Sequence, residues 1–245
     1  MAALTPLLVT RGLSRQFGGL RAVDAVDFQL QQGEIRAIIG PNGAGKTTFV
    51  SLVCGRVLPS AGKVEFDGVD ITRMAAHRRT RLGIAYTFQI TSVFLNLSAY
   101  DNVALAAQRR HAATGSKALD AEVSEALARV GLADRAHELA RNLSYGHQRL
   151  LEIAMGLALK PRLLILDEPT QGLSDGEIAN FVALVREIAV EATVLLIEHN
   201  MHVVMELAQK ITVMNFGRIL AEGTPADIRA NTAVQDAYLG TGSDG

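Results

Sequence analysis

The sequence contains a single cysteine, Cys54, among its 245 residues. One thiol can form neither a disulfide within the chain nor a zinc site built from thiolates, which fits a reducing compartment. An excess of charge of one sign is also missing, because 24 lysines and arginines stand against 25 aspartates and glutamates. The formal net charge of -1 excludes a general positive field that would hold a nucleic-acid backbone or an anionic membrane.

A long, purely apolar run is the third absence. The longest stretch without a charged residue, residues 82–100, is interrupted by polar side chains: Thr87, Gln89, Thr91, Ser92, Asn96 and Ser98. A membrane-spanning helix needs about 20 mainly apolar residues, so none is predicted. Residues 1–10 lack the basic segment of a signal peptide and carry Pro6 within their apolar run. We therefore expect a cytoplasmic protein.

The hydrophobic pattern changes twice along the chain. Strand patterns in the first third cover residues 7–9, 26–30, 35–39 and 64–66. The middle is rich in Ala, Leu, Glu and Arg at helical spacing and predicts helices over residues 99–111, 116–130 and 144–159. In the last third, apolar strands at residues 163–166, 193–197 and 211–214 alternate with helices at residues 176–191 and 201–209. This alternation predicts a parallel sheet covered by helices.

A glycine-rich loop joins the strand at residues 35–39 to the helix that follows it. Its sequence matches G-x-x-x-x-G-K-S/T at every fixed position. Backbone N–H groups of such a loop turn toward phosphate oxygens, Lys46 reaches the β- and γ-phosphates, and the Thr47 hydroxyl binds Mg²⁺. The predicted ATP-binding residues are those of the loop and the next threonine: Gly40, Pro41, Asn42, Gly43, Ala44, Gly45, Lys46, Thr47 and Thr48.

Two carboxylates, Asp167 and Glu168, follow the apolar run at residues 163–166. Ligands of open α/β sheets bind at the carboxyl ends of the strands, so the pair is expected beside the phosphate loop. Asp167 suits a Mg²⁺ partner that acts through a bound water. Glu168, one residue further on, suits the general base that polarises the attacking water.

With these two motifs placed, the chain resembles the ATP-binding cassette (ABC) ATPases over essentially its whole length. Residues 143–147, Leu-Ser-Tyr-Gly-His, are similar to the family's signature L-S-G-G-Q. Gln89 stands where the family has its Q-loop glutamine, and His199 stands where it has its switch histidine. Phe17 matches the upstream aromatic residue that stacks on adenine. The motifs occur in the family's order.

The resemblance implies a P-loop NTPase fold of the ABC-cassette type, with ATP and Mg²⁺ as ligands. A RecA-like core with an antiparallel β subdomain would comprise residues 1–89 and 158–245, and a helical, signature-bearing subdomain residues 90–157, within one ABC ATPase domain. The implied catalytic residues are Glu168, His199 and Gln89, and the implied Mg²⁺ partners are Thr47, Gln89 and Asp167. The signature residues would act on ATP that is held by a second cassette, either identical or related. They are Ser144, Tyr145, Gly146 and His147.

A closer resemblance is to the ATP-binding subunits of branched-chain amino acid importers. It rests on residues 17–20, 87–89 and 143–146 and on the tail at residues 222–225 and 237–240. Such subunits lie on the inner face of the membrane, bound to two permease subunits, and serve a periplasmic solute-binding protein indirectly. The permeases are expected to dock near Gln89 and residues 91–100. ATPases of urea, amide and aromatic-acid importers and of lipopolysaccharide export are similar and stay open as alternatives.

Two positions depart from the family pattern. The D-loop, which often ends S-A-L-D, reads Gln-Gly-Leu-Ser at residues 171–174, and Asp175 is not assigned its role. His147 replaces the signature glutamine. A soluble cassette acting on DNA or ribosomes is less favoured, because the chain has one phosphate loop and no heptad run. The basic residues at 77–81 and 109–110 are interpreted as solvated helix faces, so no nucleic-acid partner is expected.

Overall fold

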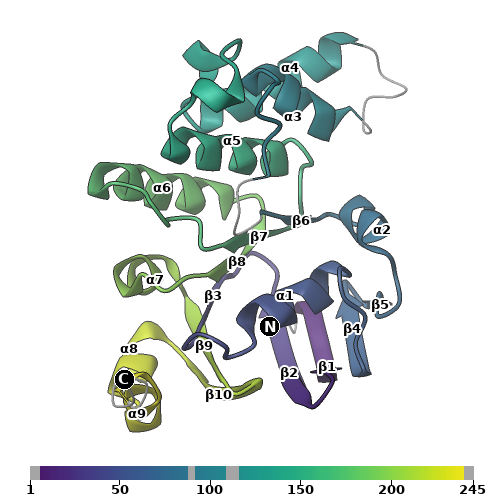
Figure 1. The fold of residues 1–245 in the computed structure, drawn as a ribbon, viewed down its shortest axis with the longest axis vertical. Helices are drawn as coiled ribbons and strands as arrows, with labels where there is room; N and C mark the ends of the chain where they lie inside the picture. The colour runs from purple at the N-terminus through teal and green to yellow at the C-terminus, as the bar shows by residue number, and fades with distance from the viewer. Residues whose placement is uncertain (1–5, 88–91, 109–115, 240–245) are drawn as a thin grey trace, which may run out of the picture.

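The computed structural model describes residues 6–87, 92–108 and 116–239. These residues form two β-sheets and three groups of helices along one elongated molecule (Figure 1). Helices α3 (Ala99–Ala107), α4 (Ser116–Arg129) and α5 (Tyr145–Leu157) lie at one end, and α8 (Pro225–Ala230) and α9 (Thr232–Leu239) lie at the other. The parallel sheet lies between these ends, and the antiparallel sheet lies at the same end as α8 and α9 (Figure 1).

The first sheet is antiparallel and has the strand order β2-β1-β4-β5. Its strands are β1 (Pro6–Phe17), β2 (Leu20–Gln31), β4 (Ala61–Phe66) and β5 (Val69–Asp70). Along β2, buried Val26, Phe28 and Leu30 alternate with exposed residues, which is the period of a strand with one face on the core. Residues buried under this sheet pack against α1 (Lys46–Cys54), where the rings of Phe28 and Phe49 meet edge to face.

The second sheet carries the site and has the strand order β10-β9-β3-β8-β7-β6. Its strands are β3 (Ile35–Ile39), β6 (Ile84–Tyr86), β7 (Leu163–Asp167), β8 (Thr193–Ile197), β9 (Lys210–Asn215) and β10 (Arg218–Gly223). All are parallel except β10, which pairs antiparallel with β9. Because β3, β7 and β8 are buried throughout, their continuous apolar runs fit a sheet covered on both faces.

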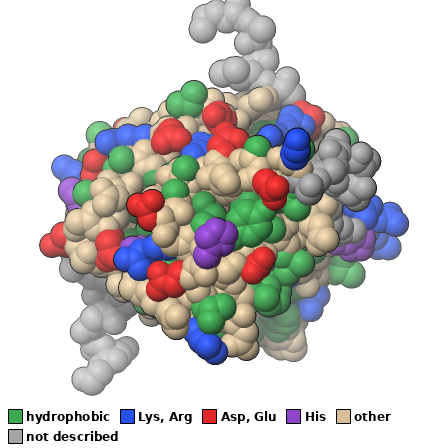
Figure 2. All heavy atoms as spheres, turned by 90° about the horizontal axis from the view of Figure 1, so that it is seen from above, with side chains coloured by type: hydrophobic (Ala, Val, Ile, Leu, Met, Phe, Trp, Pro, Cys, Tyr) green, Lys and Arg blue, Asp and Glu red, His purple; other side chains and the backbone are tan. Residues whose placement is uncertain are grey.

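Helices cover the second sheet and extend beyond it. α6 (Asp175–Ile188) and α7 (Met201–Leu207) bury apolar side chains in the sheet, while α3, α4 and α5 pack on one another beyond α6 (Figure 1). Seen from their end, these three helices present a group of hydrophobic side chains surrounded by charged ones (Figure 2). Among the described residues, no helix combines the length and apolar character that crossing a bilayer requires.

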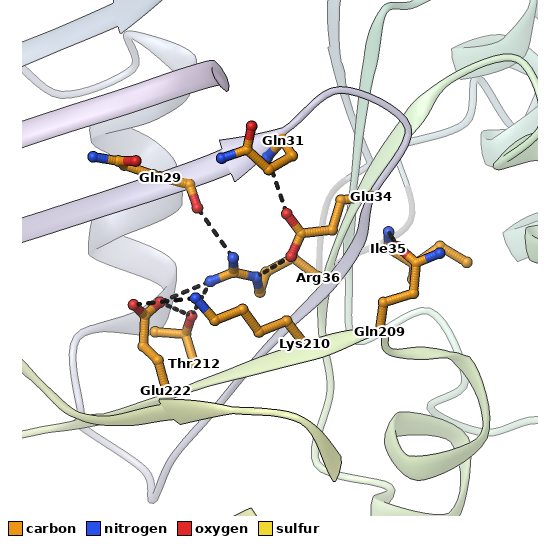
Figure 3. Close-up of polar contacts among 9 residues, drawn as sticks. All are labelled: Gln29, Gln31, Glu34, Ile35, Arg36, Gln209, Lys210, Thr212 and Glu222. Carbon is orange, nitrogen blue, oxygen red and sulfur yellow. Dashed lines mark hydrogen bonds and ion pairs between the residues drawn. The ribbon is translucent and has the colours of Figure 1, made fainter. Parts of the chain in front are cut away.

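A buried arginine joins the two sheets. Arg36 on β3 is 2% exposed, and its guanidinium donates to Glu34 at 2.6 Å, Glu222 at 2.7 Å and Thr212 at 2.9 Å (Figure 3). It also donates to the backbone carbonyl of Gln29 on β2, at 3.1 Å. Since Glu222 lies on β10 and Thr212 on β9, one side chain ties the antiparallel sheet to the edge of the parallel one.

The structure confirms the predicted α/β class and differs at two local points. The strand β6 was not predicted, because its three residues fall in the uncharged stretch at residues 82–100. The interpretation of residues 77–81 as a solvated face is wrong for Arg79 on α2 (Ala76–Arg81), which is 1% exposed. Its guanidinium donates to the Leu52 and Val53 carbonyls, both at 2.7 Å, and so satisfies the end of α1. Arg109 and Arg110 lie outside the described residues.

Candidate active site

The glycine-rich loop runs from the end of β3 to the first turn of α1 and leaves no room for side chains at two of its glycines. A Cβ at Gly40 would lie 2.1 Å from the Met214 carbonyl oxygen, and one at Gly45 would lie 2.3 Å from the Ala22 carbonyl oxygen. Gly45 caps α1 with φ 99°, a left-handed conformation that favours glycine. The loop is further held by the Gly217 N–H, which donates to the Ala44 carbonyl at 3.0 Å.

Lys46 lies at the start of α1 with its ammonium group folded into this loop. The Nζ atom donates to the Gly40 carbonyl at 2.6 Å and to the Pro41 carbonyl at 3.1 Å. Burial lowers the pKa of Lys46, while the charges of Glu168 and Asp167 oppose that shift. The cation, the loop and the acidic pair are therefore neighbours, as the sequence predicted for a phosphate site. Thr47, next to Lys46, is exposed.

Asp167 ends β7 and is 1% exposed. One carboxylate oxygen, Oδ2, accepts a hydrogen bond of 2.7 Å from the Tyr86 hydroxyl, and the other, Oδ1, is buried without a hydrogen-bond partner. Burial raises the pKa of Asp167, and the Tyr86 hydrogen bond opposes that shift. A buried oxygen of this kind needs a partner, and a water bound to Mg²⁺ would supply one. The donor set therefore fits the expected ion.

Glu168 is half-buried and has φ 49°, a left-handed conformation unusual for a residue with a side chain. Its backbone N–H donates to the Ile197 carbonyl at the end of β8, at 2.8 Å. A conformation of this kind costs roughly 1–3 kcal/mol and persists only where the surroundings fix it. The backbone hydrogen bond to the end of β8 is one contact that fixes Glu168 in this conformation.

The other predicted catalytic residues differ in what the structure says of them. His199 follows β8 by two residues, and 63% of its side chain is exposed, so it is available to a ligand at the carboxyl edge of the sheet. Gln89 lies outside the described residues. Phe17 ends β1 and is 44% exposed, with the Arg15 guanidinium carbon 4.4 Å from its ring centre. An aromatic face at this position suits stacking of a flat base.

The signature residues form the N-terminus of α5. Ser144 caps the helix by accepting a hydrogen bond of 3.2 Å from the His147 N–H. Gly146 is buried, and a Cβ there would lie 2.4 Å from a carboxylate oxygen of Glu177. Tyr145 is 44% exposed, and its ring lies so close to Gly172 that a Cβ at Gly172 would be 2.9 Å from it. The signature and the D-loop of the same chain are therefore packed together.

The structure thus gathers the phosphate loop, Asp167, Glu168 and His199 along one edge of the parallel sheet, while the signature belongs to the helical end of the molecule (Figure 1). One contributor was missed in the sequence. Tyr86 was noted only as part of a motif, yet its hydroxyl holds Asp167 from the neighbouring strand. Nothing local to Tyr86 indicates a carboxylate that lies 81 residues away along the chain.

Comparisons with known proteins show the family of the chain. The family model described as "ABC transporter" matches residues 23–171, more than half of the chain. The chain therefore belongs to the ATP-binding proteins of ABC transporters, and it is an ATPase whose hydrolysis of ATP is coupled to transport. A second model, "Branched-chain amino acid ATP-binding cassette transporter", matches residues 218–244. Within the ABC class, the chain belongs to the branched-chain amino acid transporter ATPase family.

Sequence alignments with curated relatives extend over nearly the whole of this chain and nearly the whole of each relative. The chain is 39% identical over 251 residues to the high-affinity branched-chain amino acid transport ATP-binding protein BraF of Pseudomonas aeruginosa, covering 96% of this chain and 98% of the relative. It is 38% identical over 252 residues to LivG of Escherichia coli, with the same coverage. A nucleotide-free ATP-binding cassette from an ABC transporter superposes with a TM-score of 0.87 at 25% identity, over 96% of this chain and 99% of that one.

Proposed function

We propose that this chain hydrolyses Mg²⁺-bound ATP at the carboxyl edge of its parallel sheet and thereby drives uptake of branched-chain amino acids. The observation that carries the site is the neighbourhood of the buried Lys46 ammonium, the half-buried Glu168 and the buried, unpartnered Oδ1 of Asp167. The solute class is supported by the names of the relatives BraF and LivG.

Each residue has a defined part in this proposal. The loop N–H groups and Lys46 bind the phosphates, and the Thr47 hydroxyl and Asp167, acting through water, would hold Mg²⁺, with Gln89 as a further partner. When bound, the ion would compensate the negative charge of the phosphates. Glu168 orients the attacking water and accepts its proton, and His199 contacts the γ-phosphate. Phe17 stacks on the adenine.

The proposed site is completed by a second cassette. Ser144, Tyr145, Gly146 and His147 would act on ATP held by the partner chain, because α5 belongs to the helical end while Lys46 lies on α1 against the other part of the molecule. The starts of helices favour anions, and Ser144 adds a hydroxyl there. We also propose that residues 90–157 act as one subdomain, with the core made of residues 1–89 and 158–245.

The membrane partners are expected at the helical end of the molecule. The segment at residues 92–108 exposes four large hydrophobic side chains: Phe94, Leu95, Leu97 and Leu105. Exposed apolar side chains gathered on one face are typical of interaction sites, and Figure 2 shows such a group on this end. We propose that two permease subunits bind this surface, which places the chain on the cytoplasmic face of the membrane and links it indirectly to a periplasmic solute-binding protein.

The decisive experiment on the site is Glu168→Gln. An amide cannot accept the proton of the attacking water, so hydrolysis should fall by roughly 10²–10⁴-fold while ATP binding is retained. Gel filtration with ATP should then show a trapped dimer. Hydrolysis close to that of the unaltered chain would remove the base role from Glu168.

The solute is tested with the complete transporter. The chain, co-purified with its permeases and incubated with the solute-binding protein, should hydrolyse ATP faster when leucine, isoleucine or valine is added. Stimulation by urea, amides or aromatic acids instead would assign the transporter to one of the alternative importers. Stimulation by lipopolysaccharide would make it an exporter.

A further inference from the structure

Glu198 directly follows β8 and has a fully buried side chain, although the sequence pattern did not single it out. Its carboxylate accepts hydrogen bonds from two separate loops. Oε1 accepts from the Thr170 N–H at 3.0 Å and from the Thr170 hydroxyl. Oε2 accepts from the N–H groups of His199 at 2.9 Å and Asn200 at 3.0 Å.

The two loops are those that carry the proposed catalytic groups. Thr170 lies two residues after Glu168, in the turn that leaves β7, and His199 follows Glu198 itself in the turn that leaves β8. A backbone hydrogen bond of 2.8 Å from the Glu168 N–H to the Ile197 carbonyl joins the same two turns at their base. The Glu198 carboxylate adds a second connection between the two turns, beyond the ends of the strands.

A carboxylate is well suited to this connection. Burying a charge is unfavourable unless several donors satisfy it, and hydrogen bonds to an ionised acceptor are shorter and stronger than those between neutral groups. The two oxygens of one carboxylate are held rigidly relative to each other. Donors from both turns are therefore fixed to one planar group, which limits how far Glu168 and His199 can move apart.

We propose that Glu198 is a positioning residue for hydrolysis: through Thr170 and the His199 N–H, it sets the loop of the base against the loop of the γ-phosphate contact. This inference rests on the proposed function. The phosphate loop is not part of the connection, because Lys46 is held by the carbonyls of Gly40 and Pro41. Glu198 therefore controls the chemical step and leaves ATP binding unchanged.

The test is Glu198→Gln in the full-length chain, which replaces one acceptor oxygen by an NH₂ group facing N–H donors. Misplacement by about 1 Å costs on the order of 10²-fold in rate, so kcat should fall by about that factor. The KM for ATP and the affinity for a fluorescent ATP analogue should change by no more than about twofold, since only the transition-state geometry is affected. Rates are expressed per nucleotide-binding site, which removes any effect of a smaller folded fraction.

Glu34→Gln is the matched control. Glu34 is also a nearly buried carboxylate that accepts two hydrogen bonds, from the Arg36 guanidinium at 2.6 Å and from the Gln31 N–H at 3.0 Å, but it lies between the two sheets. Both variants lose hydrogen bonding to a buried carboxylate, yet only Glu198→Gln should lose turnover. Equal kcat values for the two variants would overturn the proposal.

A milder change covers the case in which Glu198→Gln does not fold. Thr170→Val removes only the hydroxyl donor and should lower kcat by roughly tenfold, because one of the bonds on Oε1 remains. In the double variant the two losses should not multiply, since both remove parts of one network. A Thr170→Val chain with unchanged kcat would overturn the proposal by itself.

The outcomes also separate this inference from the proposed function. If Glu168→Gln keeps its turnover, the proposed site itself is wrong. If Glu168→Gln loses turnover and only the Glu198 and Thr170 variants keep theirs, this inference alone is wrong.

Discussion

Lys46 and Asp167 show how burial acts on single charged residues near the phosphate loop. Burial lowers the pKa of Lys46 and raises that of Asp167, so both shifts favour the neutral form. In the proposed site, a bound triphosphate would place negative charge beside Lys46, and Mg²⁺ would place positive charge beside Asp167. Both ligands would therefore favour the charged forms of these side chains and oppose the pKa shifts that burial causes.

Replacing Lys46 by alanine tests whether its ammonium group contributes to ATP binding and hydrolysis. Lys46→Ala removes the main cation at the β- and γ-phosphates, so ATP hydrolysis should fall by at least about 10²-fold, the effect of losing one preorganised electrostatic contact. ATP affinity is measured by isothermal titration, with Lys63→Ala on β4 as the control. Affinity and turnover equal to those of the control would show that the loop does not bind the phosphates.

Cys54 is a buried residue without a part in the site. Burial at the end of α1 raises the pKa of its thiol from 9.0 to about 12, so the reactive thiolate is suppressed at neutral pH. The native thiol should therefore react on the order of 10³-fold more slowly with a disulfide reagent than an exposed thiol does. The reaction is followed at pH 8 with and without urea. Equally fast labelling in both states would show that α1 opens readily.

At the scale of elements, the D-loop departure has a structural role. Ser174, where many family members have aspartate, caps α6 and forms a capping box with Glu177. Ser174 accepts from the Glu177 N–H, and the Glu177 carboxylate accepts from the Ser174 N–H at 2.8 Å. Ser174 therefore satisfies N–H groups at the start of α6, the helix that follows the D-loop.

Removing this cap should weaken the fold measurably. Ser174→Ala should lower the free energy of unfolding by about 1 kcal/mol, the usual effect of losing a serine cap. Urea titration measures this. Ser124→Ala, on the exposed face of α4, is the control and should raise stability by a few tenths of a kcal/mol, because alanine favours helix. Equal effects would show that the cap does not stabilise α6.

The capping box also gives a dependence on pH. Hydrogen bonds from the Ser174 backbone and side chain lower the pKa of Glu177. A carboxylate with a lowered pKa stabilises the fold above its ordinary value of 4.5, and this contribution disappears as the pH falls through the lowered value. The stability difference between the unaltered chain and Ser174→Ala should therefore shrink in acid. A difference that is constant between neutral pH and strong acid would contradict this.

At the scale of the whole molecule, the Arg36 network decides how the two sheets are held together. Arg36→Met would leave the nearly buried Glu34 without its cation, while Glu222 would keep Lys210, whose Nζ lies 3.9 Å away. Breaking a buried ion pair by removing one partner costs roughly 3–5 kcal/mol, measurable by urea unfolding. Arg186→Met breaks the exposed pair with Glu206 and should cost less than about 1 kcal/mol. Similar losses in both variants would rule out a special role for Arg36.

The composite site is tested by mixing two inactive chains. A Lys46→Ala chain and a Ser144→Arg chain are each inactive at both sites of a homodimer. In a mixed dimer, the intact Lys46 of one chain faces the intact Ser144 of the other, so part of the ATPase activity should return. If the physiological partner is a different cassette, the variants are distributed over that pair. If mixed dimers form, as confirmed by mass, and no ATPase activity returns, the two chains do not share an active site.

The sequence by itself determined the fold class and where along the fold the candidate site residues fall, for a physical reason. A phosphate loop, a buried strand ending in Asp167 and Glu168, and a change from strand to helix periodicity are local patterns, which neighbouring residues impose through backbone geometry and burial. The carboxyl ends of parallel strands meet at one edge, so local patterns also predict that His199 lies beside the acidic pair.

Only the tertiary structure decided which polar groups complete one another. Arg79 resembles its solvated neighbours in the sequence, but the carbonyls that bury it belong to α1, more than 20 residues earlier. Tyr86 reaches Asp167 across 81 residues, and Glu198 reaches Thr170 across 28. Glu198 ends an apolar run in the same way as Asp167, which is a signal that could have been noticed. Its role still depends on donors that face it only after β7 and β8 have paired, because a carboxylate's function is set by what surrounds it.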